Sequence, residues 1–466
     1  MALRHSSRAS EPGDTSSSRL ILALACFLVL NAFGVNGILS RVSPPAYRET
    51  VLTHSTDVLQ AHSTYTDSWR VMTIALEQVD SNNGRPLYTD VFFGRHVKFQ
   101  YPPFSLLPWE ALRAIDVNWV KGGDVPYRGD GPSLDEIVSL AFLAALALAT
   151  VAILQIRLRR VGLRFLPWES AALGAVAIGL ALTFYPAVKG FTLGQIQTWL
   201  NSLFALALLA WVLDRRRLAG GLVGVLCLVK PHYGLFLLWG AIRREWGFVT
   251  AFAATAAAGL AASVFRFGWT NHVDYLGVLS YMSRHGEGFY PNQSVNGLLN
   301  RLMNLVQPGV FGNLEFFESG FPPFHPLVYW TTVVTSGAIL LLALIRRRQA
   351  ADTTLDFCIM AVSCTMASPI AWEHHYGLLL PVYAALFSSV MTSRTKLAWI
   401  AGSYVLVSNF IPATNALANT PLNVVQSYVF AGAILLLVLL HGARRGSVRL
   451  TSVEGPPVVE GLLRAS

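Results

Sequence analysis

The segment AGGLVGVLCLVKPHYGLFLLWGA, residues 219–241, decides how this chain is threaded. It is predominantly apolar except at its centre, where a Lys-Pro-His triplet occupies 230–232. Arginines flank it on both sides, at 215–217 and 243–244. A proline removes a hydrogen bond from a helix and breaks it. The segment is therefore predicted to form two short half-helices that enter and leave a membrane on the same side, with their irregular centre buried in protein.

The composition of the whole chain indicates an integral membrane protein. Of its 466 residues, 53% are hydrophobic and 13% are charged, and the mean hydropathy is +0.47. An uncharged helix of about 20 residues spans a hydrocarbon core about 30 Å thick. The net charge of +9 comes from arginine clusters beside apolar segments, a pattern typical of membrane topology signals rather than of a nucleic-acid-binding surface. The four cysteines lie in apolar segments without metal-ligand spacing and are expected to be buried.

The apolar segments predict an all-α, polytopic membrane domain over 20–441. They lie at 20–39, 136–156, 169–186, 195–213, 219–241, 248–266, 327–345, 355–370, 376–392, 397–412 and 423–441. The first is interpreted as a retained helix, because no small-residue cleavage site follows it. A disordered cytoplasmic tail is expected before it, over 1–19, and a second cytoplasmic tail over 442–466.

Basic clusters decide the orientation of these segments, because cytoplasmic loops carry an excess of Lys and Arg. Arg4, Arg8 and Arg19 precede the first segment and put the N-terminus in the cytoplasm. Later clusters lie at 346–348, 394–396 and 444–449. They also return to the cytoplasm if 219–241 is re-entrant, whereas a single ordinary crossing there would invert all of them. The re-entrant topology leaves four chemically varied segments on the outer face: 41–135, 189–194, 267–326 and 372–375.

Asp67, in the first outer segment, is the candidate general base. A carboxylate just outside a membrane crossing can take a proton from the hydroxyl group of a lipid-linked acceptor. Asp67 also fits the N-cap of a short helix over about 68–80, and the two roles are compatible. Asp57 and Asp80 are competitors in the same segment.

Three further polar residues are candidates for contact with a substrate. Lys230 is an ionisable residue at membrane depth, where such residues usually serve a function, and it is therefore a candidate for the site. The alternative is that its side chain extends to the cytoplasmic surface. Gln195 opens a helix, where its amide can meet a sugar, cap the helix or bond a neighbouring helix. Asn292 is interpreted as lining the site or fixing a loop.

The run Trp372-Glu373-His374-His375 stands at another membrane boundary. A histidine there can bind a phosphate or a hydroxyl, and the tryptophan can stack on a sugar; the alternative is an interfacial belt. Adjacent residues point in different directions, so one histidine is expected to face the site. No second histidine pair or carboxylate cluster accompanies the run, and no metal is expected. Other cations available to a phosphate are Lys98, Lys189 and Arg284.

These motifs together resemble glycosyltransferase family 87, which contains polyprenyl-phosphate-mannose-dependent α-mannosyltransferases. The resemblance covers roughly residues 60–390. It rests on the Asp67 segment with Phe99-Gln100-Tyr101-Pro102-Pro103, on Gly194-Gln195, on Asn292-Gln293-Ser294, on Ser368 to His375, and more loosely on Val229-Lys230-Pro231.

The resemblance implies a GT-C-like bundle of about ten to twelve transmembrane or re-entrant helices with outer-face loops. It implies transfer of a hexose, mannose in the family, from a polyprenyl phosphate to a lipid or glycan acceptor by inverting single displacement, without a cofactor. The reaction is expected on the periplasmic or extracellular side of the cell membrane. Asp67 is then catalytic, and the substrate-binding residues are Tyr101, Gln195, Lys230, Asn292, Trp372, Glu373, His374 and His375.

Two other functions are compatible with the same pattern. A transporter or flippase for a polyprenyl-linked glycan also needs many helices, but it should show related halves, and none are apparent here. A GT-C-type ligase, which moves a whole glycan onto an acceptor, would have a similar fold and site and is also compatible with the sequence.

Overall fold

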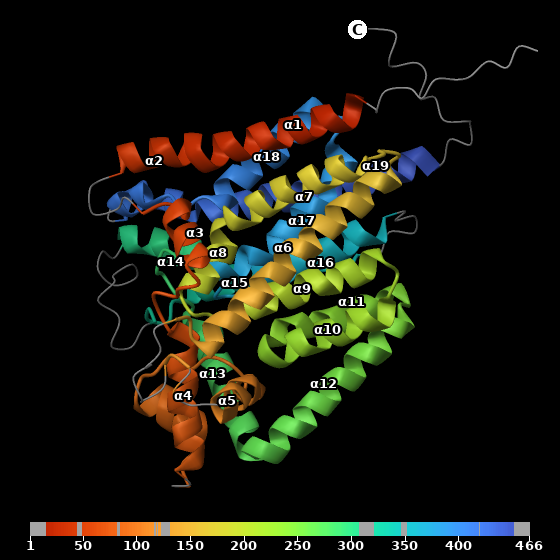
Figure 1. Cartoon of the computed structure of the whole chain (residues 1–466). Helices are drawn as coiled ribbons and strands as arrows, with labels where there is room; N and C mark the ends of the chain where they lie inside the picture. The colour runs from red at the N-terminus through yellow and green to blue at the C-terminus, as the bar shows by residue number, and fades with distance from the viewer. Residues whose placement is uncertain are drawn as a thin grey trace, which may run out of the picture.

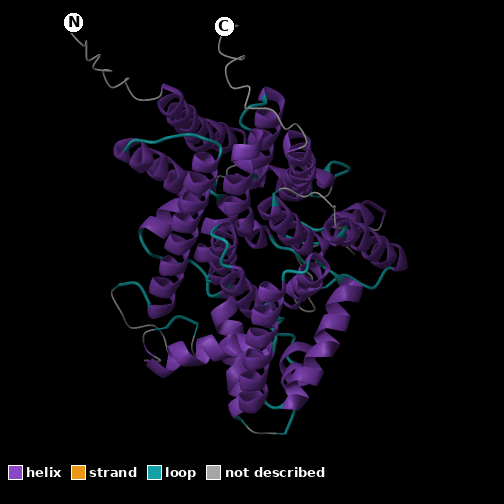
Figure 2. Cartoon of the chain, turned by 90° about the vertical axis from the view of Figure 1, so that its right-hand side faces the viewer, coloured by secondary structure: helices purple, strands orange, loops and turns teal. Residues whose placement is uncertain are grey.

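The computed structural model describes residues 15–43, 49–81, 84–115, 118, 120–122, 131–306, 321–345, 352–418 and 420–451. In these ranges the chain is helical and forms no strand (Figure 2). Five of the described helices are long and apolar enough to cross a membrane, or six if one bent pair is a single span. The predicted all-α polytopic membrane protein is confirmed at this level. The arginines at 4, 8 and 346–348 lie outside the described residues.

The first part of the chain forms one long membrane helix and several short ones. They are α1 (Thr15–Val29), η1 (Leu30–Val35), α2 (Asn36–Val42), α3 (Val51–Leu59), α4 (Asp67–Asp80), η3 (Thr89–Gly94), η4 (Pro103–Ser105) and α5 (Leu106–Ile115). The helix begins at Thr15, inside the predicted tail 1–19. The hydroxyl groups of Ser17 and Ser18 each donate to the Glu169 carboxylate at 2.7 Å, which orders this first turn.

The central helices pack into one bundle (Figure 1). They are α6 (Leu134–Arg160), α7 (Pro167–Leu182), α8 (Tyr185–Thr192), α9 (Gln197–Val212), α10 (Arg216–Val229), η6 (Pro231–Gly234), α11 (Leu235–Arg243) and α12 (Trp246–Phe267). In Figure 1, α12 runs away from the bundle toward α13 (Trp269–His285), and α4 and α5 lie near that corner.

The remaining elements complete the bundle. They are α14 (Val295–Val306), α15 (Pro326–Leu344), α16 (Thr353–Ala367), η8 (Glu373–Leu378), α17 (Leu379–Val390), α18 (Arg394–Ser408), η9 (Pro412–Leu417), η10 (Asn423–Ser427) and α19 (Tyr428–Thr451). The last helix continues past the predicted end at 441, because Arg444 is buried against the Asp356 carboxylate. Of the cysteines, Cys358 and Cys364 are buried as predicted, whereas Cys227 is half-buried and Cys26 is exposed.

Arginines from four helices collect at one end of the bundle, which we call the basic end. Arg157 on α6 donates to Asp352 at 2.5 Å, and Arg444 on α19 donates to Asp356, also at 2.5 Å. Arg243, the last residue of α11, binds Asp356 as well. Arg216, the first residue of α10, lies 3.8 Å from the carboxylate of Glu245, just before α12. The start of α10 and the end of α11 therefore lie at the same end of the molecule.

Close packing against α12 shows that the chain reverses between α10 and α11. A Cβ on Gly220 would lie 2.2 Å from the Phe248 carbonyl oxygen, and a Cβ on Gly240 would lie 3.0 Å from the Phe248 ring. At the far end of α10, Leu228 fills the space beside Gly259. The chain thus runs alongside α12, breaks at Pro231 where a break was predicted, and returns beside its own start (Figure 1).

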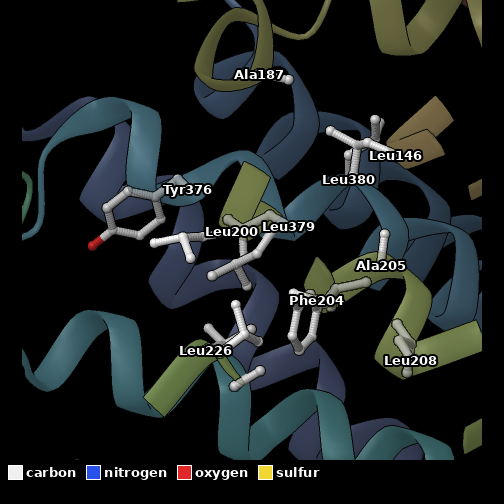
Figure 3. Close-up of a cluster of buried hydrophobic side chains, with 14 of the residues drawn as sticks. Leu146, Ala187, Leu200, Phe204, Ala205, Leu208, Leu226, Tyr376, Leu379 and Leu380 are labelled. Atoms are coloured by element: carbon white, nitrogen blue, oxygen red, sulfur yellow. The ribbon is translucent and has the colours of Figure 1, made fainter. Parts of the chain in front are cut away.

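The buried core joins this pair to the rest of the bundle. Figure 3 shows part of the buried hydrophobic cluster, with side chains from α6, α8, α9, α10, η8 and α17, among them Leu146, Phe204, Leu226 and Leu379. Inside a membrane, helices associate through close packing and interhelical hydrogen bonds rather than through exclusion of water. The core therefore fixes α10 beside α9, and with it the position of the break at Pro231.

Candidate active site

The segment that leads into Asp67 is paired with the turn that precedes α9. Asp67 N donates to Leu193 O at 3.0 Å, and Ser68 N donates to Gly194 O at 3.2 Å. Gly194 has φ of 62°, in the left-handed region that favours glycine. A Cβ there would lie 2.4 Å from the Tyr65 carbonyl oxygen. Glycine at position 194 therefore permits the close approach that brings Asp67 beside Gln195, the residue that follows Gly194.

Asp67 begins α4, which confirms the predicted short helix. The N-cap is Thr66, so Asp67 lies in the first turn and not at the cap. Its Oδ2 accepts a hydrogen bond from Gln195 Nε2 at 3.2 Å. The side chain keeps contact with solvent, yet surrounding protein atoms desolvate it enough to raise its pKa above the ordinary value; the Gln195 hydrogen bond and the charge of Lys189 act in the opposite direction. A raised pKa makes this carboxylate a stronger base than an ordinary aspartate.

Gln195 connects Asp67 to Tyr101. Its Oε1 accepts from Ser68 Oγ at 2.8 Å and from the Tyr101 hydroxyl at 3.0 Å, and the residue is 2% exposed. Ser68 Oγ also accepts from Ile196 N at 3.1 Å, which fixes the hydroxyl. Burial raises the pKa of Tyr101 to about 12, so its hydroxyl stays protonated and remains a hydrogen-bond donor.

Lys230 extends this cluster from the break between α10 and α11. Its Nζ lies 3.1 Å from His375 Nε2 and 5.5 Å from the centre of the Tyr101 ring. Across the described ranges, Lys230 forms no ion pair with a carboxylate. Contacts with the candidate site, and none with the basic end, thus hold the side chain. A half-buried cation beside an imidazole and an aromatic ring is suited to an anionic ligand.

The loop carrying Asn292 holds the Trp372 turn in place. Asn292 and Trp372 form an antiparallel bridge. The Asn292 amide donates to Glu287 O at 2.7 Å and to Pro369 O at 3.1 Å, and its Oδ1 accepts from Ala371 N at 3.0 Å. Backbone groups therefore occupy both amide hydrogens and the oxygen, which matches the loop-fixing role and leaves no amide hydrogen for a substrate.

Glu373 is turned toward two tyrosines. Its Oε2 accepts from the Tyr185 hydroxyl at 2.7 Å and its Oε1 from the Tyr428 hydroxyl at 3.3 Å. Burial raises its pKa to about 7, and the hydrogen bond from Tyr185 opposes this shift. Because a tyrosine hydroxyl occupies each carboxylate oxygen, these contacts suit a positioning role.

The two adjacent histidines have different surroundings, as expected for neighbouring residues. His375 Nε2 is engaged by Lys230. His374 Nε2 is buried and has no hydrogen-bond partner among the described residues, while the His374 carbonyl oxygen accepts from Asn201 Nδ2 at 3.0 Å. Within the described ranges, no group of three or more His, Cys, Asp or Glu side chains is arranged to hold a metal ion.

Several other predicted candidates lie apart from this cluster. Asp80 ends α4, about 20 Å from Asp67 at 1.5 Å per residue, and binds Arg266 at 2.9 Å. Asp57 lies on a different helix, α3. Arg284 is exposed near the end of α13. Lys189, in contrast, lies close enough to Asp67 for its charge to act on that carboxylate.

Two residues that build the site, Ser68 and Glu287, were not predicted from the sequence. Ser68 binds both Gln195 and Tyr101, although its type carries no signal beyond its place next to Asp67. Glu287 is 2% exposed, accepts from the Trp372 indole nitrogen, and accepts from Lys98 Nζ at 3.0 Å. A single acid in a loop without a motif offers no sequence signal, because its partners lie 85 and 189 residues away.

The fold and the cluster together define a polytopic membrane protein that gathers a carboxylate and a half-buried lysine at one site. Comparison with known families then gives its class. The model of glycosyltransferase family 87 matches residues 99–370, more than half of the chain, and the chain belongs to this family. It is therefore a membrane glycosyltransferase, which decides against the transporter alternative. Tyr101, Gln195 and Lys230 lie within the matched residues, whereas Asp67 and the turn 372–375 lie outside them.

A curated relative supports the same class. The chain is 25% identical over 344 residues to the polyprenol-phosphate-mannose-dependent alpha-(1-2)-phosphatidylinositol mannoside mannosyltransferase of Mycolicibacterium smegmatis. The aligned part covers 68% of this chain and 68% of the relative.

Proposed function

We propose that this glycosyltransferase moves a mannosyl group from a polyprenyl-phosphate donor to a hydroxyl group of a lipid or glycan acceptor. The donor and the sugar are those for which the mycobacterial relative is named, and that relative acts on a phosphatidylinositol mannoside. The observation that carries the proposal is the unbroken chain of contacts from Asp67 through Gln195 and Tyr101 to Lys230. It joins a base to a phosphate-binding cation.

Asp67 is the general base in this proposal. It takes the proton of the acceptor hydroxyl while that oxygen attacks the anomeric carbon of the donor sugar. The bond from the anomeric carbon to the phosphate oxygen breaks, and the polyprenyl phosphate leaves with the bonding electrons. One such displacement inverts the anomeric configuration. The raised pKa of Asp67 and its contact with solvent support this role.

Lys230 and His375 are the proposed ligands of the donor phosphate. Charge-assisted hydrogen bonds to a phosphate are stronger than neutral ones, and they strengthen further where water is excluded. The imidazole 3.1 Å from the ammonium orients it without neutralising its charge. The negative charge that develops on the leaving phosphate would then be stabilised where it forms.

Other side chains complete the proposed site. Trp372 is half-buried and held by Glu287, which suits a ring that stacks on a sugar. His374 Nε2 is available to a substrate hydroxyl. Glu373 and Asn292 are proposed to position the turn rather than to bind substrate.

The proposed topology puts the site on the outer face of the cell membrane. The grouping of arginines at the basic end supports a cytoplasmic location for that end. The reversal at Pro231 supports a re-entrant α10–α11 pair. The proposal takes each of the other ten apolar segments of 20–441 as one crossing, and five or six of the described helices are long and apolar enough to span by themselves. In this topology 41–135 and 267–326 are outer segments, and the chain termini are cytoplasmic. Lys230 reaches the site from within the membrane, at the tip of the re-entrant pair.

The decisive experiment supplies membranes containing the protein with radiolabelled polyprenyl-phosphate mannose and an acceptor-lipid extract. The wild type should form a labelled glycolipid that Asp67→Asn does not form. Asp80→Asn is the matched control, because it removes an acid from the same helix at the end remote from the site. Efficient transfer directly from a nucleotide sugar would contradict the proposed donor, and full activity of Asp67→Asn would contradict the proposed base.

A further inference from the structure

A buried ion cluster at the basic end holds the last residue of α11. The Asp356 carboxylate accepts from Arg243 Nη2 at 2.9 Å and from Arg444 Nη1 at 2.5 Å. The side chains of Asp356 and Arg243 are each 8% exposed and that of Arg444 is 2% exposed, so water screens these ion pairs poorly. Arg243 also donates to Ala343 O at 2.9 Å, at the carboxyl end of α15. One acid thus connects α11, α15, α16 and α19.

The same helix is fixed along its length by aromatic packing. Phe357, the neighbour of Asp356, lies with its ring centre 4.9 Å from that of Phe236 and 5.6 Å from that of Trp239, both on α11. At its start, α11 continues from η6, which begins directly after Lys230. An α-helix of nine residues is a rigid rod about 14 Å long. Displacement of its end at Arg243 is therefore carried to the tip that bears Lys230.

We infer that Asp356 is a positioning residue for Lys230, although it lies at the opposite end of α11 from the candidate site. By binding Arg243 and Arg444 together, it sets how far the α10–α11 pair reaches toward His375 and Tyr101. This inference rests on the proposed role of Lys230 in binding the donor phosphate. It adds that the affinity of the site for its anionic donor depends on an ion cluster at the basic end.

The inference predicts a selective kinetic effect. Asp356→Asn leaves the helix intact but removes the negative charge that holds both arginines. Lys230 should then be misplaced relative to the donor phosphate. A displacement of about 1 Å at a catalytic group can lower the rate on the order of a hundredfold. We expect the KM for polyprenyl-phosphate mannose to rise about tenfold, with little change in the KM for the acceptor.

Asp352→Asn is the matched control. Asp352 lies one turn earlier, also at the basic end. Among the described residues its side chain bonds to Arg157 at 2.5 Å and to the first turn of its own helix, and to neither arm of the re-entrant pair. Asparagine retains the capping of α16 by this side chain. The control should lower thermal stability to a similar degree and leave the KM for the donor near the wild-type value.

A double-mutant cycle with Lys230→Met decides the test, with kcat/KM for the donor measured on purified protein in detergent. If Asp356 acts through Lys230, Asp356→Asn should have almost no further effect in the Lys230→Met background. If the losses of kcat/KM caused by Asp356→Asn and Lys230→Met multiply in the double variant, the inference is overturned and Asp356 is a stabilising residue only. An equal loss of kcat/KM in Asp352→Asn would overturn it as well. A Lys230→Met variant with wild-type kinetics would instead overturn the proposed phosphate site, so the two failures are distinguishable.

Discussion

Substitution of Gly194 by alanine should impair the enzyme through the geometry of Asp67. The new Cβ would lie 2.4 Å from the Tyr65 carbonyl oxygen, against about 3.4 Å for ordinary contact, so the two segments must separate by about 1 Å. The φ of 62° adds about 1–2 kcal/mol of backbone strain for a residue with a side chain. The hydrogen bonds that pair Asp67 and Ser68 with this turn would lengthen, and Asp67 would move away from Gln195.

A shift of 1 Å at a catalytic base lowers kcat/KM on the order of ten- to a hundredfold. The assay is initial-rate transfer from labelled polyprenyl-phosphate mannose, together with the thermal midpoint in detergent. Gly162→Ala is the matched control: its φ is 93°, so it is strained as well, but no atom lies within 4 Å of the new Cβ. At an assay temperature where both variants are folded, Gly194→Ala should lose activity well beyond Gly162→Ala. Equal losses in the two variants would refute the reasoning, because strain alone would then explain them.

Three further predictions concern charge. The Glu373 carboxyl has a pKa of about 7, against 4.5 for an ordinary glutamate, so between these pH values the folded protein keeps a proton that the unfolded chain has lost. The contribution of Glu373 to the stability of the fold should therefore decline as pH rises from 4.5 to 7. The thermal midpoint of Glu373→Gln, measured over the same pH range, should lack this decline. In the pH profile of kcat/KM, activity should fall as pH drops through the raised pKa of Asp67. The charge of Lys189 lowers that pKa, so Lys189→Met should move the fall in activity to higher pH. If the fall does not move, a group other than Asp67 causes it. Glu287→Gln weakens the charged hydrogen bond to Lys98 and the contact with Trp372. A charged hydrogen bond contributes about 1.5–3 kcal/mol, so kcat/KM should fall about tenfold. Wild-type kinetics would show that Glu287 is not needed to hold the Trp372 ring.

The long apolar helices were predicted because each carries its own signal, whereas α3, α5, α13 and α14 lie in the segments 41–135 and 267–326, where no such apolar run was recognised. A long apolar run in a membrane protein must be helical, since backbone groups have no other partners there. The break at Pro231 was predictable for the same local reason. The ends were harder: α1 begins early because of Ser17 and Ser18, and α19 runs late because Arg444 finds Asp356. Such partners are distant in sequence and leave no local pattern.

The candidate site follows the same division. Asp67, Gln195 and Lys230 were candidates from residue type and position, and Tyr101 was a candidate from the family resemblance; the structure brings the four into one network. Residue type did not reveal that two tyrosines would occupy Glu373, one of them 188 residues away. Side-chain partnership depends on how the helices pack, and a single sequence does not report that packing.

The central claim, that Asp67 acts as base while Lys230 holds the donor, is tested most directly by separating donor binding from transfer. Labelled polyprenyl-phosphate mannose should bind purified Asp67→Asn with nearly the wild-type Kd, and a single-turnover measurement on that complex with acceptor added should show almost no transfer. Lys230→Met should instead weaken binding of the donor, and it should also slow transfer because the charge that stabilises the leaving phosphate is lost. Transfer at the wild-type rate by the Asp67→Asn complex would contradict the account.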